Sequence, residues 1–369
     1  MKEFDAHRSV LIFGGAGFIG SNWAQRLLES TEAKVHIFDN LTRPGVRYNL
    51  ESLQKLAGKS GRLQVTIGDV RDRASVEHAV TGATEIYHFA AQVAVTSSLV
   101  DPRFDFDVNV CGTFNVLEAA RKSGNRPFML FTSTNKVYGN ISQHSVKAFG
   151  RRYGYRDVVG ISELQPLDFH SPYGCSKGAA DQYVRDYARI FHLPTVVLRM
   201  SCIAGPRQFG NEDQGWVAHF LYSALRGNPV VIYGDGRQVR DVLCVHDLLR
   251  VFELTSARRH ATAGNVYNVG GGPENTISLL ELVELIEKLT GRKLQYQLDE
   301  PRPGDQLIYV SDHHKLRQHT GWRPEFTVQQ TVETIYAWWK ENRRVLAPVT
   351  VMPARIPAHA LQPVSETAA

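Results

Sequence analysis

The sequence predicts an α/β protein built on a parallel, doubly wound sheet, with a smaller α/β lobe after it. Short apolar runs typical of buried strands recur through the first 200 residues, and amphipathic stretches with helical spacing lie between most of them. A glycine-rich turn at residues 14–20 follows the first run and opens a helix. Strands that alternate with helices in this way form parallel sheets with helices on both faces.

The predicted strands of the sheet are the apolar runs at residues 9–13, 34–38, 63–67, 85–89, 127–131 and 195–199. The first helix follows the glycine turn, where Trp23, Leu27 and Leu28 recur at helical spacing. Two longer helices are predicted over residues 104–123 and 173–191.

Beyond residue 200 the pattern loosens and predicts the smaller lobe. Its expected elements are strands at 230–233, 265–269 and 293–297 and helices at 279–289 and 328–343. We therefore expect a first domain at residues 8–200, with an insert at 140–165, and a second lobe at 201–344 that is interleaved with it. Residues 345–369 are rich in Pro, Ala and Thr and are expected to form a disordered tail.

Composition argues against several classes of protein. The hydrophobic share of 43% and the charged share of 21% are ordinary for a globular protein. No apolar run approaches the ~18–20 residues of a membrane span, and the polar N-terminus shows no signal peptide. The four cysteines form no Cys-x-x-Cys pair and no His cluster indicates a metal, so we expect a cytoplasmic protein. The net charge of +5 is scattered, which does not favour nucleic-acid binding.

The glycine turn and the ends of the strands predict a dinucleotide site of the Rossmann type. Glycine lets the chain turn sharply, and a pyrophosphate can then approach the free N–H groups of the helix. Asp39 ends the second strand, where a carboxylate would bind a ribose diol and repel a 2′-phosphate; NAD is therefore favoured over NADP, although Arg43 weakens this preference. The other candidate cofactor residues at these positions are Gly14, Gly17, Phe18, Ile19, Gly20, Asn40, Asp69, Val70, Phe89, Ala90, Ala91 and Gln92.

Tyr173 and Lys177 have the spacing i, i+4, which places them on one face of a helix. A free phenol has a pKa of about 10, too high for a base at neutral pH, and a nearby ammonium would lower it. Ser133 and Thr134 lie at the end of the fifth strand, at the same rim of the sheet, where a hydroxyl could hold a substrate oxygen beside the phenol. With a dinucleotide site, this pair indicates an enzyme that transfers hydride.

The chain resembles the extended short-chain dehydrogenase/reductase superfamily of nucleotide-sugar epimerases and dehydratases over residues 8–340. The resemblance rests on the glycine turn, Asp39, Asp69, residues 90–92, Asn109, Thr134, Tyr173, Lys177, Arg240 and residues 302–305. The longer runs 133–139, 167–183, 205–209, 213–216 and 236–243 resemble the branch that inverts C2 of CDP-linked hexoses.

The resemblance implies an NAD that stays bound and is regenerated in each turnover, and a homodimer or homotetramer. The implied substrates are CDP-paratose and CDP-tyvelose, with CDP-glucose and CDP-mannose also open.

The resemblance also implies roles for individual residues. Thr134, Tyr173 and Lys177 match the catalytic hydroxyl, base and lysine, and Lys177 would also bind the nicotinamide ribose. Asn109 and Met200 belong to the cofactor side. Substrate-side candidates are Arg240 and Arg302, which match arginines that hold the diphosphate, and Gln92, Thr134, Asn135, Lys136, His170, Ser201, Arg207, Gln208, Gln214, Val217 and Tyr233.

Two features separate this chain from its relatives. In 4,6-dehydratases an Asp-Glu pair follows the threonine, whereas this chain has Asn135 and Lys136, which cannot serve as the acid and base of elimination. The insert at 140–165 is longer than plain 4-epimerases need and could form a lid over the sugar or a solvated loop. A 4-epimerase or 4,6-dehydratase of another nucleotide sugar stays an alternative, and a non-catalytic dinucleotide-binding protein is disfavoured because Tyr173 and Lys177 are both present.

Overall fold

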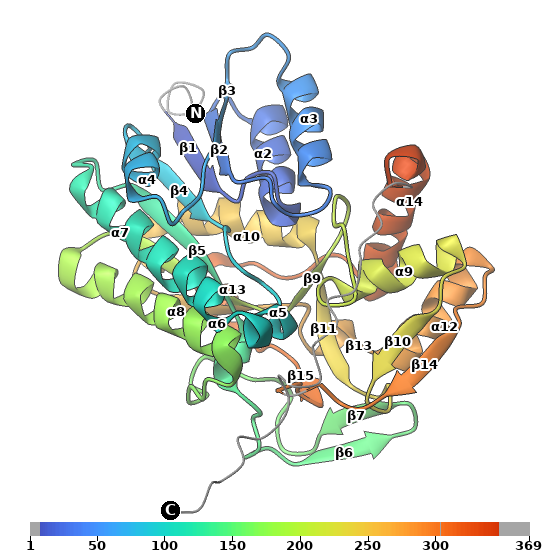
Figure 1. Cartoon of the computed structure of the whole chain (residues 1–369). Coiled ribbons are helices and arrows are strands. Elements are labelled where there is room, and N and C mark those ends of the chain that lie inside the picture. The colour runs from blue at the N-terminus through green and yellow to red at the C-terminus, as the bar shows by residue number, and fades with distance from the viewer. Residues whose placement is uncertain (1–7, 303, 347–369) are drawn as a thin grey trace, which may run out of the picture.

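A seven-stranded parallel sheet forms the centre of the larger lobe (Figure 1). The computed structural model describes residues 8–302 and 304–346. The strand order is β12-β8-β5-β4-β1-β2-β3, which confirms the predicted fold class. The strands are β1 (Ser9–Phe13), β2 (Lys34–Asp39), β3 (Leu63–Ile67), β4 (Glu85–His88), β5 (Phe128–Thr134), β8 (Thr195–Met200) and β12 (Val266–Val269).

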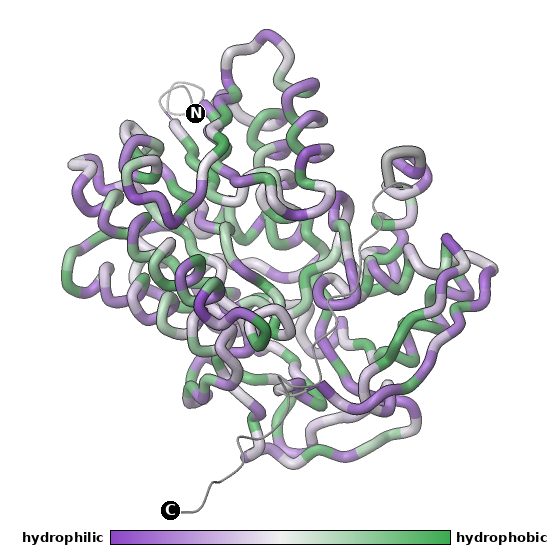
Figure 2. Tube along the Cα trace, viewed as in Figure 1, coloured by the Kyte–Doolittle hydropathy of each residue, from purple (hydrophilic) through white to green (hydrophobic). Residues whose placement is uncertain are grey.

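Helices cover both faces of this sheet because successive side chains of each buried strand point to opposite faces. In β1, Val10 and Ile12 pack in one apolar cluster, whereas Leu11 and Phe13 pack in the other. The first cluster includes α2 (Phe18–Ser30), α3 (Val46–Ala57) and α10 (Val245–Ala257). The second includes α4 (Arg73–Val80), α7 (Gly112–Lys122) and α8 (Ser171–Phe191). Figure 2 shows the hydrophobic residues gathered along the central strands and the inner sides of the helices.

The smaller lobe is built from two short sheets and three helices (Figure 1). Its strands are β9 (Cys202–Ala204), β10 (Val230–Tyr233), β11 (Val239–Cys244), β13 (Thr276–Ser278), β14 (Tyr296–Asp299) and β15 (Ile308–Tyr309). Its helices are α9 (Trp216–Arg226), α12 (Leu279–Thr290) and α14 (Val328–Leu346). The other short elements are α5 (Val95–Val100), α6 (Pro102–Phe106), α11 (Arg259–Thr262), α13 (His314–Thr320), a π-helical turn (Asp107–Cys111) and the 3-10 turns Asn135–Tyr138 and Pro273–Asn275.

Three predicted elements differ from the structure, among them the strand expected at 293–297, which is β14 (Tyr296–Asp299). The strand expected at 265–269 in the smaller lobe is β12, which pairs with β8 at the edge of the large sheet (Val266 opposite Val197). An apolar run shows that a strand exists but not which sheet it joins, and this one returns to the first domain after α10. The helix expected at 104–123 is divided into α6, the π-helical turn and α7. The tail predicted at 345–369 lies outside the described residues from 347 onward.

The insert at 140–165 forms an antiparallel hairpin, β6 (Val146–Phe149) and β7 (Arg152–Tyr155), that packs on the smaller lobe. The backbone N–H of Tyr153 donates to the carbonyl of Arg237 at 3.0 Å, and the hydroxyl of Tyr155 donates to the carbonyl of Ile308 at 3.0 Å. The hairpin is therefore anchored rather than a solvated loop. In the described part of the chain, no helix has the length and apolar character of a membrane-spanning segment.

Candidate active site

The glycine turn lies between β1 and α2, where the strand order reverses. Gly14 has a φ of +76°, and a Cβ there would lie 2.7 Å from the backbone nitrogen of Ala90, just after β4. A Cβ at Gly20 would lie 2.2 Å from the carbonyl oxygen of Gly14. Both positions therefore require glycine for close packing of the turn. No side chain caps α2 at Gly17, so its first N–H groups can bind an anion, as a pyrophosphate requires.

Asp39 ends β2 and holds the glycine turn in place. Its Oδ2 accepts a hydrogen bond from the N–H of Ala16 at 3.0 Å, and its Oδ1 accepts one from the N–H of Leu41 at 2.9 Å. Burial raises the pKa of Asp39, while these backbone donors act in the opposite direction. Each carboxylate oxygen keeps lone pairs for a ribose diol, so the residue fits the predicted role as well as a structural one.

Asp69 and Asn40 lie together at the next strand end. Asn40 Nδ2 donates to Asp69 at 3.1 Å, and Arg71 forms two hydrogen bonds with the same carboxylate at 2.9 Å. The Arg71 hydrogen bond is the largest of the effects that lower the pKa of Asp69 to about 2. Val70 is buried under α7, where a Cβ on Gly112 would lie 2.6 Å from its side chain.

Asn109 lies in the π-helical turn and ties three segments together. Its Oδ1 accepts from the N–H of Gln92 at 2.9 Å, and its Nδ2 donates to the carbonyl of Gln92 at 3.1 Å and to Ser176 at 3.0 Å. A π turn re-aims a side chain relative to an α-helix. Asn109 therefore fixes the loop after β4 against α8, which carries Tyr173 and Lys177.

Thr134, Tyr173 and Lys177 come together where β5 meets α8. Tyr173 is 9% exposed, and burial raises the pKa of its phenol to about 12, opposed by a hydrogen bond from Thr134 and the charge of Arg43. Lys177 is 3% exposed, and burial lowers the pKa of its ammonium to about 7. Its Nζ donates to the carbonyl of Thr132 at 2.7 Å. In this structure the influences on the pKa of Tyr173 are burial, Thr134, Asp105 and Arg43, while the ammonium of Lys177 is directed to the strand; the effect of Lys177 on Tyr173 stays a prediction.

The strand ends beside this group are mostly apolar. Phe89 stacks on Phe252 at 5.2 Å, with Ala90 and Ala91 following it. Met200 ends β8 and packs against the core, and the hydroxyl of Ser201 donates to the carbonyl of Asp241 at 3.1 Å. Small and apolar side chains here leave the backbone open to a planar ring.

A cavity of about 270 Å³ lies next to Tyr173. Its lining includes these predicted substrate residues: Lys136, Gln214, Tyr233, Arg240 and Arg302. The other predicted ones do not line it: Gln92, Thr134, Asn135, His170, Ser201, Arg207, Gln208 and Val217.

Arg207 and His170 lie away from the cavity because their side chains have other partners. Arg207 donates to Ser52 on α3 at 3.1 Å, and His170 pairs with Asp168 at 3.0 Å in an exposed position. Val217 is buried in the core of the smaller lobe. Each of these side chains has a partner or packing site away from the cavity.

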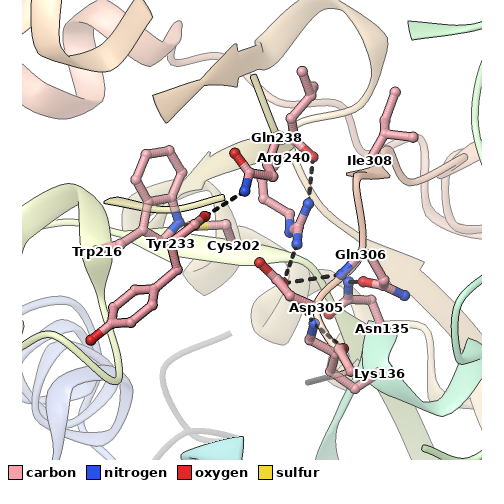
Figure 3. A network of polar contacts seen from close by, with 12 residues as sticks. Asn135, Lys136, Cys202, Trp216, Tyr233, Gln238, Arg240, Asp305, Gln306 and Ile308 are labelled. Carbon is pink, nitrogen blue, oxygen red and sulfur yellow. Dashed lines mark hydrogen bonds and ion pairs between the residues drawn. The ribbon is translucent and has the colours of Figure 1, made fainter. Parts of the chain in front are cut away.

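Each basic side chain that lines the cavity has an acidic partner, and for Lys136 and Arg240 this partner is Asp305 (Figure 3). Arg240 donates to Asp305 at 2.7 Å. Arg302 lies 3.9 Å from the centre of the Tyr233 ring and donates to the carbonyl of Glu212 at 3.1 Å. Trp216 and Phe220 add an aromatic wall. The sequence signal for these acidic partners is that the runs 213–216 and 302–305 contain an acid close to the predicted Gln214 and Arg302.

The cofactor side and the cavity are joined by one segment. Arg43, after Asp39, donates to the side chain of Gln214 in the cavity wall. A Cβ at Gly45 would lie 2.2 Å from the Phe209 ring, so the segment after Asp39 packs tightly against the segment around Phe209. The expected dinucleotide site and the cavity therefore adjoin each other through Arg43.

Comparison with known proteins agrees with this arrangement. Residues 11–335 match the family model described as GDP-mannose 4,6 dehydratase. The chain is 40% identical to CDP-paratose 2-epimerase of Salmonella typhi over 89% of this chain and 98% of that protein. It is 32% identical to dTDP-glucose 4,6-dehydratase of Neisseria gonorrhoeae over 92% and 98% of the two chains.

A solved structure is also similar. The Bacillus cereus UDP-glucuronic acid 4-epimerase, in complex with UDP-glucuronic acid and NAD, superposes with a TM-score of 0.77 at 25% identity, covering 90% of this chain and 99% of that one. These matches confirm the predicted resemblance, and the chain belongs to the GDP-mannose 4,6-dehydratase family of NAD-dependent nucleotide-sugar epimerases and dehydratases.

Proposed function

We propose that this protein is an NAD-dependent epimerase that inverts C2 of a CDP-linked hexose. The observation that carries the proposal is the pair Asn135 and Lys136 directly after Thr134, where elimination would need carboxyl groups. The 40% identity to CDP-paratose 2-epimerase supports C2 and the CDP-sugar over other choices. CDP-paratose and CDP-tyvelose are the leading substrate pair, with CDP-glucose and CDP-mannose next.

The chemistry must begin with oxidation, because a sugar C–H bond without an adjacent carbonyl is too weakly acidic for direct deprotonation. The glycine turn and Asp39 would hold an NAD, which would supply a reversible hydride acceptor and would not be consumed. Tyr173 would remove the proton of the C2 hydroxyl and later return it, which requires its phenol to ionise although burial raises the pKa to about 12. The hydrogen bond from Thr134 favours this ionisation, because it lowers the pKa of the phenol. Inversion results when the flat ketone presents its other face between the two hydride steps.

The cavity provides the rest of the binding energy. Arg240 and Arg302 present guanidinium groups to the diphosphate, a role for which their planar shape is suited. The ring of Trp216 and the side chain of Phe220 form an apolar wall for the nucleoside. Lys177 is one helical turn from Tyr173 and would bind the nicotinamide ribose.

Proton NMR in deuterium oxide, with CDP-paratose or CDP-glucose and no added cofactor, tests this proposal. A C2-inverted product without deuterium at C2 is expected, since the same hydride returns. Deuterium at C2 would mean deprotonation chemistry, and inversion at C4 would mean a 4-epimerase, the activity of the UDP-glucuronic acid relative. The control is Tyr173→Phe, which should keep its bound NAD and lose the activity; retained activity would contradict the role of Tyr173.

A further inference from the structure

Two cations converge on one carboxylate in the wall of the cavity (Figure 3). Oδ1 of Asp305 accepts a hydrogen bond from Nη2 of Arg240 at 2.7 Å and lies 3.2 Å from Nζ of Lys136. The N–H of Gln306 donates to the same oxygen at 3.1 Å. Burial opposes ionisation of Asp305, but Arg240 and Lys136 lower its pKa to about 2, so it is a carboxylate at neutral pH. Two cations share one carboxylate, which leaves one positive charge for a further anion.

Lys136 is held close to Thr134 and Tyr173. Its N–H donates to the hydroxyl of Thr134 at 3.2 Å, and Thr134 in turn is hydrogen-bonded to Tyr173. Its carbonyl oxygen lies 3.5 Å from the position of a Cβ on Gly174, the residue after Tyr173. The side chain is only 18% exposed and lines the same cavity as the phenol.

The loop that carries Asp305 is fixed to the same segment. Nδ2 of Asn135 donates to Oε1 of Gln306 at 3.0 Å, and Nε2 of Gln306 donates to the carbonyl of Gly139 at 2.6 Å. These bonds keep the ammonium of Lys136 at a set place relative to Thr134. A cationic group with fixed neighbours binds an anion with little loss of side-chain entropy.

Arg302 forms a separate cationic site. It lies over the ring of Tyr233 and pairs with Glu212 at 3.3 Å and Asp213 at 3.7 Å. These carboxylates differ from Asp305, which Arg240 and Lys136 share. Because Arg302 faces two carboxylates whereas Arg240 and Lys136 share one, the net positive charge of the cavity lies beside Thr134.

The position of the phosphate depends on which carbon reacts. The sugar is joined to the β-phosphate through the oxygen O1, which is bonded to C1. The carbon C1 is bonded directly to C2 and lies across the ring from C4. When C2 is at the phenol, the β-phosphate must lie beside Thr134 and Tyr173. When C4 is at the phenol, the same phosphate lies on the far side of the ring.

We propose that Lys136 binds the β-phosphate and thereby places C2, rather than C4, of the sugar at Tyr173. This inference rests on the proposed function. Arg240 shares the β-phosphate from the other side of Asp305.

Calorimetric titration of the NAD-loaded enzyme with CDP and with CMP tests the contact, because only CDP carries the β-phosphate. Lys136→Met should weaken CDP binding about 10- to 100-fold, as expected for a lost charged hydrogen bond, and leave CMP binding within about twofold of wild type. Lys136→Arg should restore most of the preference for CDP. Lys59→Met, which removes an exposed lysine after α3, is the matched control and should bind both as wild type does. The NAD content of each variant reports whether it has folded.

The NMR assay on wild type separates this inference from the proposed function. If wild type inverts C2 but Lys136→Met weakens CDP and CMP equally, or neither, the Lys136 assignment is overturned and the function stands. If wild type inverts C4, the proposed function fails, and with it the role of Lys136 in selecting C2, whatever the CDP titration gives. Inversion at C2 with selective loss of CDP affinity, and a matching loss of kcat/KM in Lys136→Met, supports both.

Discussion

Replacing Lys177 with methionine should stabilise the NAD-free protein while it abolishes activity. The ammonium is 3% exposed, and burial lowers its pKa from 10.5 to about 7. The gap between these values corresponds to a charging penalty of about 5 kcal/mol in the folded state. Methionine has a similar shape and no charge, and it forfeits the hydrogen bond to Thr132, worth about 1 kcal/mol. The net gain at low pH is therefore about 4 kcal/mol.

The sign of the pH dependence follows from the direction of the shift. Because the folded pKa of Lys177 lies below the unfolded one, the unfolded chain binds more protons between about pH 7 and 10.5. The stability of wild type therefore rises with pH over this window. The penalty is full below about pH 7 and disappears towards pH 10.5, where the methionine variant should be slightly the less stable of the two.

Thermal unfolding of the NAD-free proteins from pH 6 to 9.5 measures this difference. The melting temperature of Lys177→Met should exceed that of wild type by about 5–10 °C at pH 6, and the gap should shrink steadily as the pH rises. Lys59→Met should follow the wild-type curve. A Lys177→Met variant that is less stable at pH 6, or a gap that does not change with pH, would refute the reasoning.

Three further predictions concern the turn, the hairpin and the surface helices. Gly20→Ala should lose bound NAD, measured by absorbance of the purified protein, because its Cβ would lie 2.2 Å from the carbonyl of Gly14; full NAD content would show that the turn can relax. Tyr155→Phe removes the hydrogen bond to the carbonyl of Ile308 in β15 and should raise the KM for the sugar nucleotide about three- to tenfold with kcat unchanged; an unchanged KM would show that the hairpin does not support the cavity. The resemblance implies a homodimer or homotetramer, and the helices α7 and α8 expose an aromatic pair suited to a subunit interface: Phe114 and Tyr183 are 43% and 47% exposed, with rings 5.8 Å apart. Phe114→Glu should therefore turn the expected oligomer into a monomer by light scattering; an oligomer that persists in Phe114→Glu, or a monomeric wild type, would contradict an interface at these helices.

The large sheet could be predicted from sequence because its signals are local. Each strand is a short apolar run, and the glycine turn combines a φ above zero at Gly14 with close contacts at Gly20. These requirements act within a few residues, so they are visible in the chain. The partner of a strand is not local, and β12 was accordingly assigned to the smaller lobe although it pairs with β8.

The electrostatics of the site could not be predicted in the same way. The spacing of Tyr173 and Lys177 places them on one face of α8. It does not show that the ammonium of Lys177 donates a hydrogen bond to the carbonyl of Thr132. Burial then dominates both pKa values, raising one and lowering the other. The spacing of two residues fixes their proximity, whereas their charge state depends on the depth and on the acceptors of neighbouring strands.

The acids paired with the cavity arginines have a consequence for how a sugar nucleotide binds. Asp305 holds Arg240 and Lys136, and Glu212 holds Arg302, so these side chains are in place before a ligand arrives. A diphosphate must share or displace these carboxylates, so its net gain is smaller than the charges suggest. In return, each cation would lose little side-chain freedom when an anion binds, because its carboxylate partner already holds it in place.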